Sequence, residues 1–173
     1  MTPMAKLVQF RLSREEARQL LGRIASVLST SGGRKARDAI VKILNAGVTS
    51  YSWVGVYLVD GRELQLDAWS GPEATRHVRI PIGEGVCGFA AKAGRTEIVS
   101  DVSRDTRYLE CFPTTKSEIV VPIMSGGKVL GEIDIDSDTS DAFSSLDREF
   151  LEAVAAILTH TITSPGIRKL SQS

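Results

Sequence analysis

The sequence predicts an α+β fold, with a central antiparallel sheet flanked by N- and C-terminal helices. Apolar residues recur at helical intervals most clearly near the two termini, and runs rich in β-branched and aromatic residues fill the middle. Short turns join two pairs of these runs, as in hairpins. The 173 residues suffice for one domain but not for a second of full size. We expect one domain over residues 13–163, between an N-terminal tail (1–12) and a C-terminal tail (164–173).

Three long helices are predicted from apolar stripes. Ser13 and Glu16 have the spacing of a capping box, and apolar residues then recur at helical intervals up to Leu28. A second stripe covers residues 36–44, and the last covers 143–158. The first two helices therefore precede the sheet and the third follows it.

The expected sheet consists of two hairpins and two shorter strands. The first hairpin joins residues 51–59 to 63–69, and the second joins 118–124 to 128–135. The second hairpin is continuously apolar, which indicates a central position in the sheet. Shorter strands are expected at residues 76–80 and 96–99, a short helix at 89–93, and a long loop at 101–115.

Glycines cluster before the short helix, with the spacing Gly83-x-Gly85-x-x-Gly88. This spacing matches a dinucleotide-binding fingerprint, but no parallel strand and long crossover helix flank it, so a turn is favoured. Glycines in such a turn let backbone N–H groups approach a small anion such as a carboxylate.

Composition excludes several classes of protein. The 21 basic and 21 acidic residues cancel, which leaves no broad attraction to nucleic acid or to anionic lipid. The first ten residues lack the pattern of a signal peptide, and the apolar runs are short, so we expect a cytoplasmic protein without membrane contact. Two cysteines are too few for a disulfide scaffold.

Three acidic residues point to a ligand with positive charge. Asp134 and Asp136 alternate along a strand and therefore share one face of the sheet, and Glu118 begins the neighbouring strand. A solvated sheet face would also tolerate such residues. If they are covered, an ammonium group or a divalent cation would suit them, and their mutual repulsion would make one of them a proton donor.

The two cysteines form a candidate redox pair. Cys87 lies at the start of the short helix, where the helix dipole favours the thiolate, although a free cysteine is also commonly a small buried hydrophobe. Cys111 lies in the long loop, where we expect an accessible thiol. Of the two histidines, His77 lies near the loops and His160 on the last helix, and no Cys/His spacing indicates a zinc site.

Several motifs together resemble the free methionine-R-sulfoxide reductases, a family of GAF domains. The resemblance extends over about residues 13–158, and the most specific pieces contain Cys87 and Glu118. The motifs are Trp53-Val54-Gly55-Val56-Tyr57, Ile80-Pro81-Ile82-Gly83-Glu84-Gly85-Val86-Cys87-Gly88, Asp101-Val102, Cys111, Ser117-Glu118-Ile119-Val120-Val121-Pro122-Ile123 and Asp134-Ile135-Asp136-Ser137.

The resemblance implies a catalytic cycle. Cys111 matches the cysteine that attacks the sulfur of free methionine sulfoxide, which leaves methionine and a sulfenic acid. A second cysteine then forms a disulfide, which thioredoxin reduces. No cofactor and no metal is expected.

The resemblance also implies a substrate pocket. Glu118, Asp134 and Asp136 match acidic residues that hold the substrate ammonium group and help to protonate the sulfoxide oxygen. Trp53 and Tyr57 match aromatic residues that enclose its methyl-sulfur end.

The sequence departs from this family at two positions. His77 stands where most members have a further cysteine that commonly resolves the catalytic one, and Phe112 replaces an acidic residue. Either Cys87 resolves Cys111, or an external thiol does, or the chain binds a small molecule without turnover, as a GAF sensor or regulatory domain. A purely structural interaction protein would leave the three acids unexplained. Terminal helices with apolar stripes also suggest a homodimer.

Overall fold

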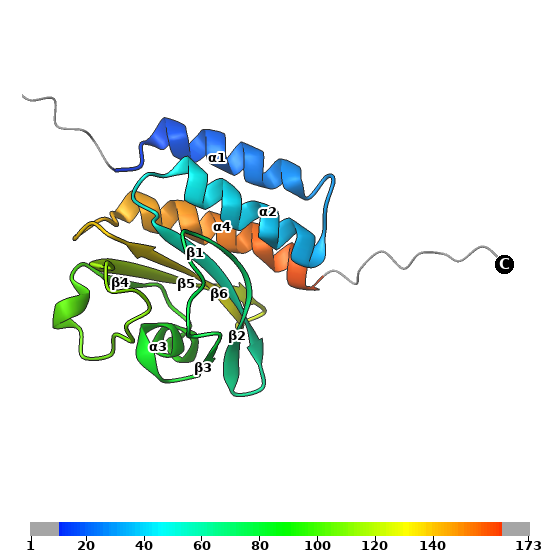
Figure 1. Cartoon of the computed structure of the whole chain (residues 1–173). Coiled ribbons are helices and arrows are strands. Elements are labelled where there is room, and N and C mark those ends of the chain that lie inside the picture. Colours follow the sequence, from blue (N-terminus) through cyan, green and yellow to red (C-terminus); the bar gives the residue numbers. More distant parts are fainter. Residues whose placement is uncertain (1–10, 164–173) are drawn as a thin grey trace, which may run out of the picture.

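The computed structural model describes residues 11–163 and confirms the α+β class. Three layers are visible in Figure 1: three helices on one face of a sheet, the sheet itself, and a short helix with long loops on the other face. The helices are α1 (Arg14–Val27), α2 (Gly33–Gly47), α3 (Gly85–Ala93) and α4 (Ser145–Thr163).

The sheet has six antiparallel strands in the order β3-β2-β1-β6-β5-β4. Both strands of the second hairpin therefore lie inside the sheet, with one of them in the central pair, as its continuous apolar character predicts. The strands are β1 (Trp53–Asp60), β2 (Glu63–Ser70), β3 (Arg79–Pro81), β4 (Glu97–Val99), β5 (Ser117–Ser125) and β6 (Lys128–Ser137).

The first helix begins as the sequence predicts. The side chain of Ser13 accepts a hydrogen bond from the backbone N–H of Glu16, and the Glu16 carboxylate accepts one from the backbone N–H of Ser13. This reciprocal pair satisfies two donors that the start of a helix leaves free. Leu12, just before the cap, is buried in the main core.

Alternation along the central strands divides the sheet residues between two cores. Ile133 and Ile135 of β6 lie in the larger core, which also holds apolar residues of α1, α2 and α4. Trp53 and Tyr57 of β1 point the other way, toward α3, in a smaller core. We call this second face, which bears α3, the site face.

Two long connections lie over the site face. The first cover loop, residues 71–78, joins β2 to β3, and the second cover loop, residues 100–116, joins β4 to β5. The expected strand at 76–80 is shorter and begins at Arg79. Residues 75 and 77 are instead engaged in loop contacts, through a hydrogen bond from the His77 N–H to the Thr75 hydroxyl.

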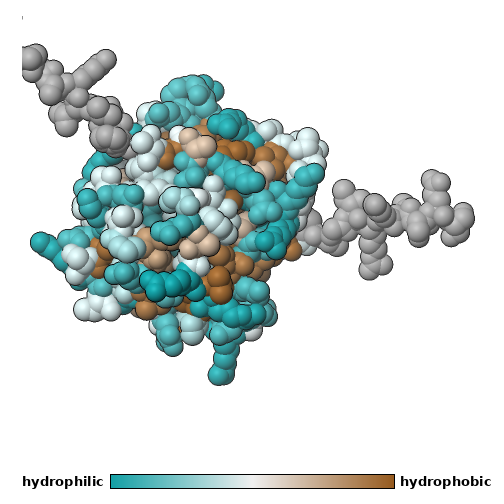
Figure 2. Space-filling model, in the orientation of Figure 1, coloured by the Kyte–Doolittle hydropathy of each residue, from teal (hydrophilic) through white to brown (hydrophobic). Residues whose placement is uncertain are grey.

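The surface of the described residues is mixed in character. In the view of Figure 2, hydrophobic residues form patches between hydrophilic ones. None of the helices within residues 11–163 combines the length and apolar character that a membrane span requires.

Helix α3 approaches the sheet closely at a glycine. A Cβ atom on Gly88 would lie 2.4 Å from the backbone oxygen of Pro81 and 2.9 Å from the backbone nitrogen of Gly83. Backbone atoms cannot move aside as a flexible side chain can, so only glycine permits this contact. The contact holds the Cys87 turn of α3 against the rest of the site face.

We predict that Gly88→Ala lowers the free energy of unfolding by about 1–3 kcal/mol, because the added methyl group must push α3 away from β3. Gly22→Ala is the matched control: Gly22 lies inside α1 with no atom within 4 Å of an added Cβ. There alanine should stabilise the protein by about 0.5–1 kcal/mol through helix propensity. Urea unfolding measures both, and equal effects would contradict the close-contact argument.

Candidate functional site

Four carboxyl groups come together on the site face. Strand β5 supplies Glu118, and β6 supplies the others, Glu132, Asp134 and Asp136. Antiparallel register places Glu118 directly opposite Asp136, and alternation puts the side chains of β6 residues 132, 134 and 136 on one face. All four are buried, with at most 3% of any residue exposed. The solvated sheet face considered from the sequence is therefore wrong.

These buried carboxyl groups are almost entirely without partners. Within residues 11–163, seven of their eight oxygens accept no hydrogen bond, and none of the four residues forms an ion pair. The eighth, Oε1 of Glu118, lies 3.9 Å from Sγ of Cys87, a weak contact. Burying a polar group without a partner costs about 1–3 kcal/mol. Such a cluster is arranged for a ligand that brings positive charge or hydrogen-bond donors.

Burial and repulsion shift the titration of the cluster. Burial raises the pKa of Asp134 to about 6. Burial, followed by the charges of the neighbouring carboxylates, raises the pKa values of Glu118 and Asp136 well above their ordinary values. Glu132 shifts in the same direction, with burial as the main cause. Burial therefore favours the protonated form of these carboxyl groups.

Cys87 faces the acid cluster from α3. The helix begins at Gly85, earlier than the sequence predicts, so Cys87 lies within its first turn. Burial, together with the charges of Asp134 and Glu132, raises the pKa of this thiol well above its ordinary value. The expectation that the helix dipole would favour the thiolate is therefore wrong for this state, because burial beside carboxylates outweighs the dipole.

Cys111 is half-buried in the second cover loop and packs against the smaller core. Its neighbour Phe112 is buried, with its ring 5.7 Å from that of Trp53. Burial, and then the charges of Asp134 and Asp136, raise the pKa of the Cys111 thiol. The expectation of a freely accessible thiol is therefore wrong, because the loop folds over the sheet and places Cys111 near the acids. Both cysteines are free thiols.

Trp53 and Tyr57 form the aromatic part of the site face. Added Cβ atoms on Gly55 and Gly71 would lie 2.3 and 2.4 Å from the Trp53 indole, so these glycines make room for the ring. In the β1–β6 register, Trp53 lies opposite Asp136 and Tyr57 opposite Glu132. The aromatic rings therefore border the carboxyl groups directly.

Both aromatic side chains also hold the first cover loop. The Trp53 indole N–H donates to the backbone oxygen of Glu73 at 3.2 Å, and the Tyr57 hydroxyl donates to that of His77 at 2.8 Å. The His77 ring connects the two loops, since its Nε2 lies 3.0 Å from the backbone oxygen of Glu110, next to Cys111. Both the backbone and the ring of His77 therefore take part in the contacts that hold the two cover loops on the site face.

Three polar residues near this cluster are not among the predicted site residues. Glu132 follows the same alternation as the two aspartates, which was sufficient to place it on the site face. Tyr108 and Thr115 of the second cover loop have buried oxygens without partners among the described residues. No periodic pattern in the loop could have signalled them.

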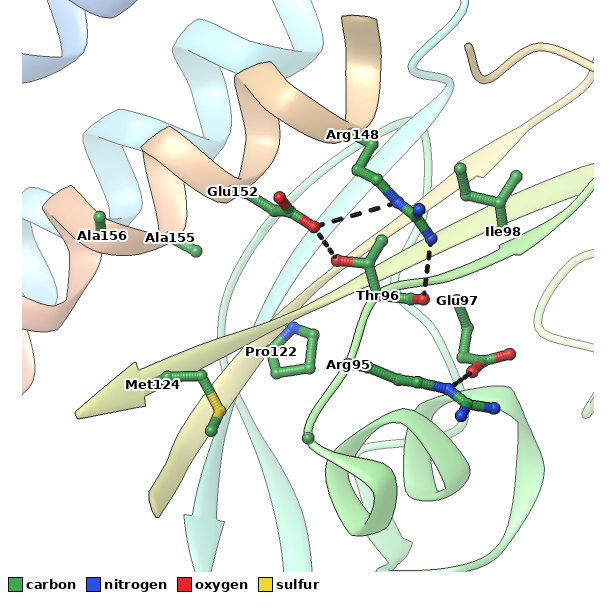
Figure 3. A pocket seen from close by; sticks show the side chains of 11 residues that line it. Arg95, Thr96, Glu97, Ile98, Pro122, Met124, Arg148, Glu152, Ala155 and Ala156 are labelled. Atoms are coloured by element: carbon green, nitrogen blue, oxygen red, sulfur yellow. Dashed lines mark hydrogen bonds and ion pairs between the residues drawn. The ribbon is translucent and has the colours of Figure 1, made fainter. Parts of the chain in front are cut away.

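A separate surface hollow, of about 740 Å³, lies between β4, β5 and α4. Figure 3 shows Arg148 and Glu152 of α4 pointing toward Thr96. The Thr96 hydroxyl donates to Glu152 at 2.7 Å, and Arg148 donates to the Thr96 backbone oxygen at 3.3 Å. Arg95 pairs with Glu97 at 2.9 Å. Because these polar groups already satisfy one another, the hollow is a weaker candidate than the acid cluster.

Comparisons with known proteins identify the family of this chain. The family model for the GAF domain matches residues 34–162. Free methionine-R-sulfoxide reductase from Saccharomyces cerevisiae is 41% identical over 111 residues, covering 62% of this chain and 61% of the yeast protein.

Solved structures of GAF proteins superpose on most of the chain. The free methionine-R-sulfoxide reductase of Neisseria meningitidis, in complex with its substrate, is 34% identical with a TM-score of 0.80, covering 88% of this chain and 93% of that one. A putative GAF sensor protein from Burkholderia vietnamiensis is 28% identical with a TM-score of 0.79, over 85% and 93% of the two chains. The chain belongs to the GAF domain family.

Proposed function

We propose that this protein reduces free L-methionine-R-sulfoxide to methionine, with Cys111 as the nucleophile and the buried acids as the binding site for the substrate ammonium group. The observation that carries the proposal is a set of seven carboxylate oxygens that have no partner among the described residues and lie beside a cysteine and two aromatic rings. An α-ammonium group supplies the positive charge and the N–H donors that these oxygens lack. Relatives named for this activity support the substrate.

The chemistry requires a thiolate close to the sulfoxide sulfur. The Cys111 thiolate attacks that sulfur, and with one proton the oxygen passes to Cys111, giving methionine and a sulfenic acid. The negative charges that oppose this thiolate belong to Asp134 and Asp136. The substrate ammonium group offsets these charges when it binds, so binding favours the reactive form of the thiol. A carboxyl group of the cluster supplies the proton.

A second thiol must return Cys111 to its reduced form. Attack of that thiol on the sulfenic acid forms a disulfide and releases water, and a dithiol of the thioredoxin class then reduces the disulfide. Since His77 occupies the position of the further cysteine, Cys87 is the internal candidate. Cys87 borders the same acids as Cys111, as the charges that act on both thiols indicate.

Turnover tests the cysteine roles. Cys111→Ser should abolish methionine release under every reductant, because the proposal makes Cys111 the thiol that attacks the sulfoxide sulfur. Cys87→Ser should lose turnover with thioredoxin but keep it with excess dithiothreitol, which resolves the sulfenic acid externally. Peptide-bound sulfoxide and the S epimer are the control substrates. Full activity of Cys111→Ser would refute its assignment as the nucleophile.

Binding tests the role of the acids separately from turnover. In a Cys111→Ser background, which prevents reaction, Asp134→Asn should weaken binding of the sulfoxide about tenfold or more, since a charge-assisted hydrogen bond is lost. Asp60→Asn, in an exposed side chain at the end of β1, is the matched control and should change nothing. N-acetylation of the substrate should reproduce the loss. Calorimetric titration measures all three, and unchanged affinity for the acetylated compound would contradict amine recognition.

The alternative is a GAF sensor that binds a small molecule without turnover. The resemblance to a putative sensor and the histidine at position 77 favour it. The two functions separate in one comparison: tight binding of the sulfoxide in the wild-type protein, with no methionine released under thioredoxin or dithiothreitol, identifies the sensor.

A homodimer through the helical layer remains a prediction. A shallow apolar hollow lies between α1 and α4, lined by Leu21, Leu146 and Phe150 among others. Leu21 and Leu146 are only partly buried, so covering them with a second copy would remove apolar surface from water. Light scattering at micromolar concentration should give twice the monomer mass, and a monomer would remove this prediction.

A further inference from the structure

We propose that Cys87, Glu118 and Asp134 form a binding site for a thiophilic divalent cation of the Zn²⁺ class in the reduced protein. One ligand atom from each of these residues lies within 4.8 Å of the others, and all three residues are buried. The residues come from α3, β5 and β6, so the fold itself assembles them. This inference goes beyond the reductase proposal, because metal binding requires no sulfoxide chemistry.

The distances suit tetrahedral coordination after a small adjustment. With a Zn–S bond of about 2.3 Å and Zn–O bonds of about 2.0–2.2 Å, neighbouring ligand atoms in a tetrahedral shell are about 3.5 Å apart. Sγ of Cys87 and Oε1 of Glu118 are already 3.9 Å apart. Since no pair of the three atoms is more than 4.8 Å apart, a contraction of at most about 1.3 Å brings them around one ion.

The partnerless oxygens of Asp134 provide a second and independent indication of a cation. Both oxygens are buried and accept no hydrogen bond from the described residues, so both are available as ligands. Glu132, on the same strand, adds another buried carboxyl group beside Cys87 and Asp134. Four carboxyl groups exceed the single positive charge of an amino acid's ammonium group, and a divalent ion neutralises two negative charges.

The sulfur atom determines the class of ion. Carboxylates alone would suit Mg²⁺ or Ca²⁺, which prefer oxygen ligands at octahedral or higher coordination. A thiolate in the set favours Zn²⁺ and the late divalent transition metals. On binding, the Cys87 thiol releases its proton and the metal–sulfur bond forms, with no change in oxidation state.

Such an ion would occupy two of the acids assigned to the substrate ammonium group and would hold the thiol assigned to resolve Cys111. Metal and substrate then exclude one another, a consequence that rests on the proposed function. The metal site itself does not rest on it.

Cobalt absorption tests the site without an activity assay. The reduced full chain, titrated with Co²⁺ without oxygen, should develop thiolate-to-cobalt charge-transfer absorption that saturates at about one ion per chain, and Zn²⁺ should abolish it. About a hundredfold excess of Mg²⁺ or Ca²⁺ should leave the cobalt absorption unchanged, because these ions prefer oxygen ligands and compete poorly for a thiolate site. Cys111→Ser should keep the absorption, Cys87→Ser should lose it, and Asp134→Asn should weaken Co²⁺ binding about tenfold.

Three results would overturn the proposal: no charge-transfer absorption in the wild-type protein, unchanged absorption in Cys87→Ser, or its loss in Cys111→Ser alone. Circular dichroism shows whether each variant is folded. If Cys87→Ser does not fold, alkylation of the wild-type protein decides: Zn²⁺ should slow modification of Cys87 more than that of Cys111, and equal rates with and without Zn²⁺ would refute the site.

Discussion

The burial of four carboxyl groups on one face of a sheet, with no ion-pair partner among residues 11–163, is the constraint on which the rest of this site depends. Glu118, Glu132, Asp134 and Asp136 lie on β5 and β6, which are paired on both sides, so they cannot move to solvent without breaking the sheet. Two things lower the free-energy cost of burying these carboxyl groups. One is protonation, which burial favours by raising their pKa values, and the other is a positively charged ligand. The protein thus holds unfavourable electrostatic free energy that a suitable ligand releases.

The covering elements determine which ligands can release it. Helix α3 contributes Cys87 through a contact that only glycine at position 88 allows, and the second cover loop contributes Cys111 beside the Trp53 ring. The His77 ring joins the two cover loops through the backbone oxygen of Glu110. Acids, thiols and aromatic rings are therefore enclosed together, an arrangement suited to a small molecule with an ammonium group at one end and a sulfur atom at the other.

Much of this could be predicted from the sequence, for identifiable reasons. Helical and strand periods predicted the layers, the central hairpin and the shared face of Asp134 and Asp136, because those patterns reflect local geometry. The same alternation also places Glu132 on that face, so the sequence was sufficient to predict its position. The burial of Cys87 and Cys111 could not be predicted, since it depends on α3 and an irregular loop packing against distant strands. That tertiary burial raises both thiol pKa values, against the expectation from the helix dipole and the loop.

The central claim is that the acids hold the ammonium group of a substrate whose sulfur faces Cys111. A crystal structure of Cys111→Ser with L-methionine-R-sulfoxide tests it most directly. The account predicts the substrate nitrogen within hydrogen-bond distance of Glu118, Asp134 or Asp136, and the sulfoxide sulfur beside residue 111 and the Trp53 ring. A substrate bound in the hollow between β4, β5 and α4, or bound with its carboxylate and not its nitrogen toward the acids, would contradict it.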